Sequence, residues 1–302
     1  MATVEAYAAS HVGRVRKGNE DNYLMMDVPM NDRAVSVQGS EDVIKIDSKR
    51  LDITEKGVVL AVSDGMGGAL AGEVASRLAV ETVAEKFSVD EDLYSEFGHQ
   101  DRLLSLLYES AVAANQNIFT QGRSDARFQG MGATFTGAIV TPDSVEIVQV
   151  GDSRAYIIRD SGIYQLTKDQ SLVQQLIDAN QISAEDAETH ALRNVILQAL
   201  GAQYEVFPVT TRLFPNDGDV LMICSDGLSN KISGDEMRKI VLDNSADLST
   251  ACTKLIDTAN ENGGEDNITV VLARISGEEL GNDDALRVIH VHLDDIHDTE
   301  ES

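Results

Sequence analysis

VVLAVSDGMGGALAGEVAS, residues 58–76, combines an apolar run, an aspartate, a glycine cluster and the start of a helical pattern. The apolar and β-branched residues up to Val62 predict a buried strand, and Asp64 follows where that strand ends. The glycines invite comparison with phosphate-binding loops. They match neither G-x-G-x-x-G nor G-x-x-x-x-G-K-[ST], and no lysine follows. An aspartate at this place would also repel a phosphate unless a cation stood between them.

The same construction occurs a second time, at residues 220–227, VLMICSDG. Each copy is an apolar strand that ends in Ser-Asp-Gly, with Asp64 in the first copy and Asp226 in the second. One such end is typical of a turn, because Asp-Gly is a strong turn pair. Two copies of the same pattern indicate two strands whose ends place carboxylates at one site.

Other acidic residues stand at comparable junctions between predicted elements. Asp266 precedes the apolar run of GEDNITVVL, and Asp152 lies between two strand segments in VQVGDSRAYII. Glu20 and Asp21 follow the basic residues of RVRKGNED. Each of these acids alone is typical of a turn or of a solvated charge, and a chain with 51 acids offers many coincidences. Turns and solvated charges do not explain why the whole set of acidic residues occurs together.

Strand signals bounded by turn residues recur through the chain, at residues 58–62, 133–140, 144–150, 153–159, 219–224 and 267–275. The gaps within 133–166 are too short for crossover helices, so this stretch is predicted to be an antiparallel meander. Apolar residues at three- and four-residue steps predict helices near 72–87, 101–121, 171–179, 235–243 and 247–261. Strands in meanders, with helices in separate groups, favour an α+β layered fold over a doubly wound sheet.

The domain organisation is predicted to be simple. No Pro- or Ser-rich linker interrupts the middle of the chain, so residues 1–276 are interpreted as one domain. Residues 277–302 are dense in Asp and Glu apart from the short apolar stretch LRVIHVHL. This C-terminal segment is expected to be an acidic tail or one extra edge strand, with a docking element for a basic partner as a third alternative.

The charge of the chain limits its partners, because 51 Asp and Glu oppose 24 Lys and Arg, for a formal net charge of -27 over 302 residues. Such a surface repels nucleic acid and anionic membrane, and it suits basic peptide segments, cations or high salt. The N-terminus lacks the apolar region of a signal peptide, and the apolar runs are too short for a membrane span. The two cysteines are expected to be reduced core thiols, so a cytoplasmic protein is predicted.

The chain resembles the metal-dependent protein phosphatases of the protein phosphatase 2C family, in their bacterial form. The resemblance runs from about residue 6 to 275, in the family's order, through GRVRKGNEDNYL, VSDGMGGALAGEVAS, GMGATFTGAIV, VGDSRAYI, LTKDQSLVQQL, NVILQALG, CSDGL and EDNITVVL. It implies that residues 1–276 form a catalytic domain. The implied fold is a four-layer αββα sandwich, with two antiparallel β-sheets flanked by helices and a metal site at one end.

The resemblance also implies the ligands of that site. Asp64 bridges two metal ions, the carbonyl of Gly65 joins one of them, and Asp226 and Asp266 hold the other. Glu20 and Asp21 serve the site directly or through metal-bound water. Asp152, with Asp226, holds a weaker third ion. The candidate ligands include no His or Cys, so Mn²⁺ or Mg²⁺ is favoured over Zn²⁺ or copper.

The reaction implied by the resemblance is hydrolysis of phosphoserine and phosphothreonine in proteins by a metal-activated water, without a phospho-enzyme. Arg16, four residues before Glu20, has the spacing of the family's phosphate-binding arginine, and a guanidinium grips phosphate oxygens in pairs. The expected partners are phosphorylated substrates of a cognate serine/threonine kinase, and the expected oligomeric state is a monomer. The alternative is a catalytically weak relative that binds phosphoproteins as a regulatory module. The presence of Asp64, Asp226, Asp266 and Arg16 argues against this alternative.

Two residues depart from the family pattern. Met66 stands where eukaryotic relatives carry a His that is thought to protonate the leaving group, so no side-chain general acid is assigned. Gln170 stands where bacterial relatives usually have a His. Its segment, TKDQS, opens the stretch 168–201, which resembles the family's mobile flap, so the change puts flap contacts in doubt more than catalysis.

Overall fold

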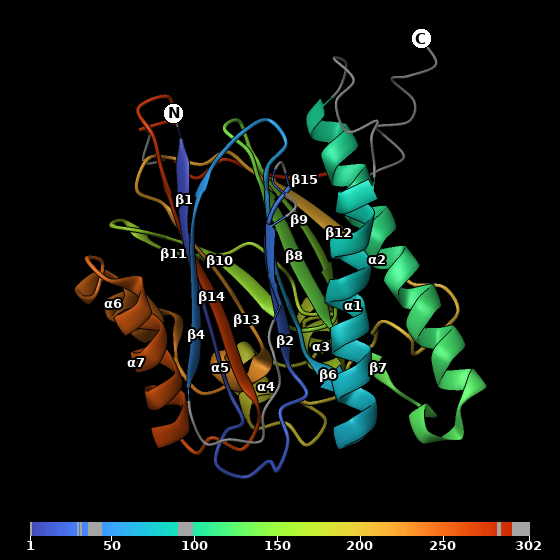
Figure 1. The fold of residues 1–302 in the computed structure, drawn as a ribbon. Coiled ribbons are helices and arrows are strands. Elements are labelled where there is room, and N and C mark those ends of the chain that lie inside the picture. The colour runs from blue at the N-terminus through green and yellow to red at the C-terminus, as the bar shows by residue number, and fades with distance from the viewer. Residues whose placement is uncertain are drawn as a thin grey trace.

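The structure is a computed structural model that describes residues 2–28, 30, 32–35, 44–89, 99–282 and 285–291. Its centre is two antiparallel sheets packed face to face (Figure 1). The six-stranded sheet has the order β11 (Gly162–Gln165), β10 (Arg154–Arg159), β13 (Val220–Cys224), β14 (Ile268–Ser276), β1 (Thr3–His11) and β4 (Lys45–Asp52). The seven-stranded sheet has the order β15 (Val288–His290), β12 (Val209–Leu213), β9 (Val145–Val150), β8 (Phe135–Val140), β5 (Val58–Ser63), β2 (Asn22–Asp27) and β3 (Asp32–Val35).

Helices cover the outer face of each sheet. The long helices α1 (Ala69–Val89) and α2 (His99–Ser124) pack on the seven-stranded sheet, and α6 (Gly234–Asp243) and α7 (Leu248–Glu261) pack on the six-stranded sheet (Figure 1). Three shorter helices lie in the connections: α3 (Leu172–Asp178), α4 (Ala184–Glu188) and α5 (Asp226–Ser229). This arrangement confirms the predicted α+β fold of two antiparallel sheets flanked by helices.

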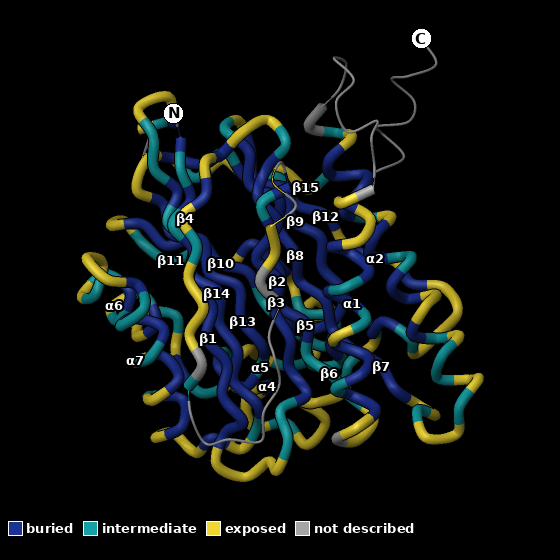
Figure 2. The backbone as a smooth tube through the Cα atoms, viewed as in Figure 1, coloured by how far each residue is buried: buried dark blue, intermediate teal, exposed yellow. Residues whose placement is uncertain are grey.

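The central strands are buried on both faces because three separate cores surround the sheets. In β2, Leu24 and Met26 pack toward α1 and α2, whereas Tyr23 and Met25 pack between the two sheets. Burial on both faces explains why the central strands read as continuous apolar runs rather than as alternating ones. Figure 2 shows the result, with buried strands inside and exposed residues mainly in the loops. Both cysteines, Cys224 and Cys252, are buried and unpaired.

The predicted single meander at 133–166 is wrong. β8 and β9 form a hairpin in the seven-stranded sheet, but β10 and β11 form a hairpin in the six-stranded sheet. The chain crosses between the sheets at residues 151–153, where Gly151 adopts φ +101. A β-carbon at Gly151 would lie 2.8 Å from the Thr134 side chain, so only glycine fits this crossing without strain. The crossing places Asp152 at one end of the sandwich.

The four N-terminal strands β1 to β4, the strand β12 and the short helices α4 and α5 were not among the predicted elements. β1, TVEAYAASH, is rich in alanine and has a weak strand signal. It pairs along its whole length with β14 and also pairs with β4. Long-range pairing therefore overrides its local preference.

Part of the C-terminal segment packs on the domain. β15 pairs with β12 at the edge of the seven-stranded sheet, and Leu280 is buried in the core between the sheets. The buried ion pair of Arg159 and Asp219, with Nε and Oδ1 2.7 Å apart, lies beside this segment. Arg159 Nη1 also donates to the carbonyl of Ala285 at 3.4 Å. Residues 283, 284 and 292–302 lie outside the described residues, and the division of the chain at residue 276 stays a prediction. No helix in the described part of the chain is long and apolar enough to cross a membrane.

Candidate active site

One end of the sandwich gathers residues from distant parts of the sequence around a cavity of about 300 Å³. Asp64 follows β5, Asp226 begins α5, and Asp266 stands just before β14. The cavity lining includes seven of the residues that the sequence singled out: Arg16, Glu20, Asp64, Gly65, Asp152, Asp226 and Asp266. Figure 1 shows α5 and the short strand β6 (Gly65–Met66) at the same end of the sandwich. The two Ser-Asp-Gly strand ends therefore do meet at one place.

Asp64 is held by the strand next to it. Ser63 Oγ donates to the carbonyl of Thr134 at 2.6 Å, and Asp64 N donates to Thr134 Oγ1 at 3.0 Å. Thr134 N returns a hydrogen bond to the Asp64 carbonyl at 2.8 Å. Gly65 then pairs with Ala133 in the two-stranded sheet of β6 and β7 (Gly132–Ala133). These bonds fix the backbone on both sides of the carboxylate.

The glycine cluster makes room for a carboxylate rather than for a phosphate. A β-carbon on Gly72, in the first turn of α1, would lie 1.8 Å from Glu20 Oε2. A β-carbon on Gly65 would lie 2.1 Å from the carbonyl of Gly72. Ser76, one turn further along α1, donates its hydroxyl to the Glu20 carbonyl. Sequence reasoning assigned no role to Gly72 or Ser76, although both lie in the stretch 58–76.

Glu20 and Asp21 are separated by the structure. Glu20 lines the cavity, whereas Asp21 lies behind it and is 1% exposed. Ser225 Oγ donates to Asp21 Oδ2 at 2.7 Å, and Asp21 Oδ1 has no hydrogen-bond partner among the described residues. Burial raises the pKa of Asp21 to about 7. A buried carboxylate oxygen without a partner is costly, and it marks a place where a positive charge is favoured.

The carboxylates are crowded enough to oppose one another's ionisation. Burial, together with repulsion from Asp21, Asp226 and Asp152, raises the pKa of Asp64 well above its ordinary value. Burial and repulsion from Asp226 raise the pKa of Asp152 to about 7. Burial and repulsion from Asp266 raise the pKa of Asp226 to about 6, although a hydrogen bond with Asp64 opposes this shift. Several carboxylates in one buried place cannot all stay ionised unless cations neutralise them.

Arg16 stands at the mouth of the cavity. Its Nη2 lies 2.7 Å from Asp266 Oδ2, and its side chain is 48% exposed. The other oxygen, Asp266 Oδ1, accepts a hydrogen bond from Asn267 N at 2.9 Å. The guanidinium is therefore beside the acids and open to solvent, where an anionic ligand can reach it.

The donor set suits hard cations by its chemistry. The described residues that line the cavity include acids and a glycine carbonyl but no His or Cys, which is the ligand set of Mg²⁺ and Mn²⁺. Among the described residues, no group of three or more His, Cys, Asp or Glu side chains is gathered tightly enough to hold an ion alone. Mg²⁺ keeps several waters when it binds to proteins. The fit to metal ions therefore rests on the oxygen donors and on the crowded negative charge.

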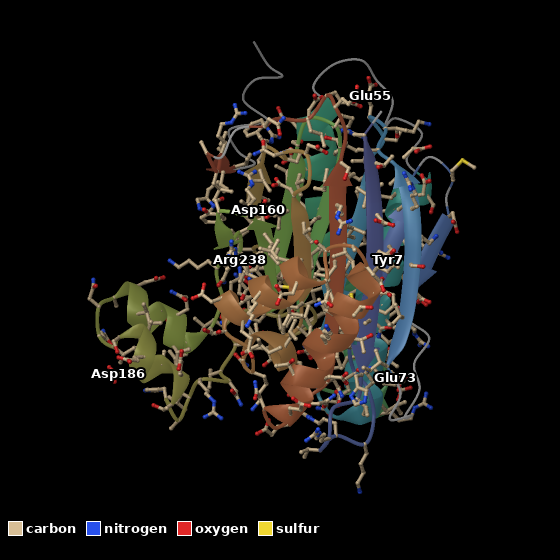
Figure 3. All side chains as sticks on the ribbon, turned by 90° about the vertical axis from the view of Figure 1, so that its left-hand side faces the viewer. Tyr7, Glu55, Glu73, Asp160, Asp186 and Arg238 are labelled. Atoms are coloured by element: carbon tan, nitrogen blue, oxygen red, sulfur yellow. The ribbon has the colours of Figure 1, made fainter. Side chains whose placement is uncertain are left out.

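The cavity also contains residues that sequence reasoning did not select, namely Thr134, Asn194 and Ile196. Asn194 belongs to the predicted flap, residues 168–201, which carries α3 and α4. Figure 3 shows this lobe, marked by Asp186, projecting from the sandwich. A second cavity of about 630 Å³ lies under it and shares Asp152 and Asp226 with the first. Asn194 opens the motif NVILQALG, but that motif did not indicate that the residue lines the cavity, because the flap reaches the site only in the folded chain.

Gln170 connects the flap to the crossing between the sheets. Gly151 N donates to Gln170 Oε1 at 2.7 Å, and Gln170 N donates to the Gly151 carbonyl at 2.9 Å. On the flap side, Leu197 N donates to the Gln170 carbonyl at 2.7 Å. The residue therefore braces the backbone next to Asp152 as well as contacting the flap. Met66, the other departure, lines the cavity itself.

Comparisons with known proteins agree on one family. A family model of protein phosphatase 2C matches residues 41–273. The serine/threonine phosphatase stp of Listeria innocua is 36% identical over 230 residues, which are 76% of this chain and 89% of that protein. The crystal structure of the Mycobacterium tuberculosis serine/threonine phosphatase PstP/Ppp has a TM-score of 0.71 at 32% identity, over 91% of this chain and 100% of that one. The catalytic domain of PstP in complex with two manganese ions has a TM-score of 0.69 at 32% identity, over the same shares.

Proposed function

Because the chain belongs to the protein phosphatase 2C family and is a protein serine/threonine phosphatase, we propose that it hydrolyses phosphoserine and phosphothreonine with two divalent cations bound in the acidic cavity. The observation that carries this proposal is the meeting of the two Ser-Asp-Gly strand ends with Arg16 around one cavity. The family is metal-dependent, and one structural neighbour holds two manganese ions. The proposed cation is Mn²⁺ or Mg²⁺.

The proposed ligands share an oxygen donor at or directly behind the cavity: Glu20, Asp21, Asp64, the Gly65 carbonyl, Asp152, Asp226 and Asp266. Asp64 is proposed to bridge two ions, and Asp152 with Asp226 to hold a weaker third one. Bound there, the cations would neutralise the crowded carboxylates and activate a water for attack on phosphorus. The raised pKa values of Asp64, Asp152 and Asp226 support this assignment, because the ionised carboxylates need a positive charge nearby.

The side chains in the cavity support direct hydrolysis without a phospho-enzyme. Among the described lining residues, Thr134 carries the only hydroxyl. That hydroxyl lies 2.6 Å from Ser153 Oγ and accepts from Asp64 N, so it is engaged in holding the Asp64 backbone. The Met66 thioether has no proton to donate. The proposed roles of the protein are therefore to orient the phosphate through Arg16 and to hold the ligand carboxylates.

Activity is expected to depend on divalent cations. Turnover of an aryl phosphate and of phosphothreonine peptides should vanish with chelator and return with Mn²⁺ or Mg²⁺, because water alone is a poor nucleophile at neutral pH. Parallel titration with the two metals would show which is preferred, and a phosphotyrosine peptide serves as the specificity control. Undiminished turnover in chelator would contradict the two-metal proposal. A protein that binds phosphopeptides with metal but never turns them over would favour the regulatory binding module.

Arg16→Ala is expected to separate substrate binding from metal binding. Loss of a charge-assisted, paired contact to the phosphate should raise KM by about 10- to 100-fold, with a smaller change in kcat. Mn²⁺ affinity, measured by calorimetry, should be nearly unchanged. Arg14→Ala is the matched control, because Arg14 is exposed in the same loop but does not line the cavity. A large loss of Mn²⁺ affinity in Arg16→Ala would assign Arg16 a role in building the metal site instead.

The partners and location extend the same proposal. We expect phosphoprotein substrates of a cognate serine/threonine kinase, a monomeric protein and a cytoplasmic location. The net charge of -27 favours basic segments around the phosphorylated residue over nucleic acid or anionic membrane.

A further inference from the structure

The loop that carries Arg16 has few backbone attachments of its own. Residues 12–21, here called the arginine loop, connect β1 to β2, and residues 14–17 at its tip are exposed. Arg14 N donates to the carbonyl of Gly264 at 2.7 Å. The loop has no strand partners, so its shape depends on contacts from outside it.

Asn267 contacts both ends of the arginine loop, in addition to the bonds that Asn19 donates to Ser10 and that Ser76 donates to the Glu20 carbonyl. Its Nδ2 donates to the carbonyl of Val12 at 2.9 Å and to the carbonyl of Gly18 at 3.0 Å. Its Oδ1 accepts from Glu20 N at 2.8 Å. The side chain is buried and uses both donors and its acceptor on loop backbone. One amide group thus joins the two ends of the loop across Arg16.

The arginine loop also packs directly against the turn that carries Asn267. Gly13 has φ +80, and a β-carbon there would lie 2.2 Å from the carbonyl oxygen of Asp266. The tip of the loop then returns to the same turn, where Arg16 meets the Asp266 carboxylate. Asp266 and Asn267 are neighbours in the chain, so the turn that contributes an acid to the cavity also holds the loop that contributes the arginine.

We infer that Asn267 is a positioning residue that closes the arginine loop and thereby presents Arg16 to the substrate phosphate. This inference rests on the proposed function of Arg16. A guanidinium on a closed loop loses less conformational freedom when it binds phosphate than one on an open loop. Release of the loop therefore weakens phosphate binding. Asp64, Asp152, Asp226 and Asp266 lie outside the loop, and the Glu20 backbone is still held by Ser76, whose hydroxyl donates to the Glu20 carbonyl.

Asn267→Ala tests the inference, because it removes all three side-chain bonds but keeps the Asn267 N bond to Asp266 Oδ1. KM for a short phosphothreonine peptide is expected to rise about five- to tenfold, with a smaller change in kcat. In an Arg16→Ala background the same substitution is expected to change KM by less than about twofold, because the two residues act through one contact. An equal increase of KM in both backgrounds would overturn the inference.

Asn115→Ala is the matched control. Asn115 is equally buried, donates to the carbonyls of Gln203 and Tyr204, and accepts from Gly201 N. It makes the same three kinds of bond to another loop and does not line the cavity. Its loss is expected to lower the melting temperature about as much as Asn267→Ala, with KM unchanged. A similar rise of KM in Asn115→Ala would assign the Asn267 effect to general destabilisation.

Hydrogen exchange gives a readout that does not depend on turnover. The amides of Gly13 and Arg14, which donate to His11 Nδ1 and to the Gly264 carbonyl, should exchange about tenfold faster in Asn267→Ala than in the wild type, with β1 and β14 unchanged. Should that variant not fold, Asn267→Asp keeps the acceptor for Glu20 N, loses both donors, and should show the same local change. Unchanged exchange at Gly13 and Arg14 would overturn the inference whatever the turnover. A wild type without phosphatase activity would instead contradict the proposed function.

Discussion

Replacing Asp64 by alanine is expected to reduce kcat by about a thousandfold or more. Its carboxylate is proposed to bridge the two cations, so its loss should remove the means of activating water rather than one contact to the substrate. Asp64 lines the cavity together with Asp152, Asp226 and Asp266. Turnover of a phosphothreonine peptide at saturating Mn²⁺ measures the effect.

The same substitution is expected to stabilise the protein in the absence of cations. The pKa of Asp64 is raised in the folded state, so ionisation of Asp64 opposes folding at pH values above its unfolded pKa. Asp64→Ala or Asp64→Asn should therefore raise the melting temperature in chelator at neutral pH. The same variants should have lost most of their activity when turnover is measured at saturating Mn²⁺. Asp143→Ala, in the exposed turn between β8 and β9, serves as the control and should change neither quantity. Retention of more than a tenth of kcat in Asp64→Ala would contradict the bridging role.

Truncation after Ser276 is expected to lower the free energy of unfolding by about 4 kcal/mol. It removes Leu280, which is buried between the sheets, and the partly buried Leu286 and Val288 that pack against the same core. It also removes β15, so β12 becomes an open sheet edge that can pair with other chains. Denaturant unfolding and light scattering measure the two consequences.

Single substitutions locate the origin of this effect. Leu280→Ala should cost about 2–4 kcal/mol by itself, because it leaves a cavity in the core. Ile289→Ala, on an edge side chain that is 50% exposed, should change stability by less than about 0.5 kcal/mol. A truncated protein as stable as the full chain would show that residues 277–302 form a tail that does not stabilise the domain. Turnover of a small aryl phosphate should survive truncation, since none of the described residues beyond 276 lines the active-site cavity.

Much of the site could be predicted from the sequence, because acidic residues at strand ends leave a local pattern. An apolar run that stops at Ser-Asp-Gly appears twice, and each copy delivers its aspartate to the cavity. Asp266 and Asp152 were found in the same way, at junctions beside unmistakable strands. Helices α1, α2, α6 and α7 lie within a few residues of the predicted ranges, because their apolar periodicity is strong. The ordered family motifs then fixed the fold class and the function.

Tertiary structure alone decided features that depend on contacts between distant segments. The alanine-rich β1 becomes a strand because β14 and β4 pair with it. The turn at which the chain changes sheets requires glycine at position 151, because Thr134 leaves no room for a β-carbon there. Glu20 lines the cavity whereas its neighbour Asp21 is buried behind it, and only the folded chain distinguishes these two adjacent acids.

Asn267 shows the same limit most clearly. In the sequence it is the polar residue of EDNITVVL beside a candidate ligand, and nothing local distinguishes it from a turn residue. Its proposed positioning role depends on folding, which brings the backbone of Val12, Gly18 and Glu20 to its side-chain amide. Sequence by itself determined which chemical groups are present and on which elements they stand. The three-dimensional packing decided which of them touch, because hydrogen bonds between segments about 250 residues apart leave no local pattern.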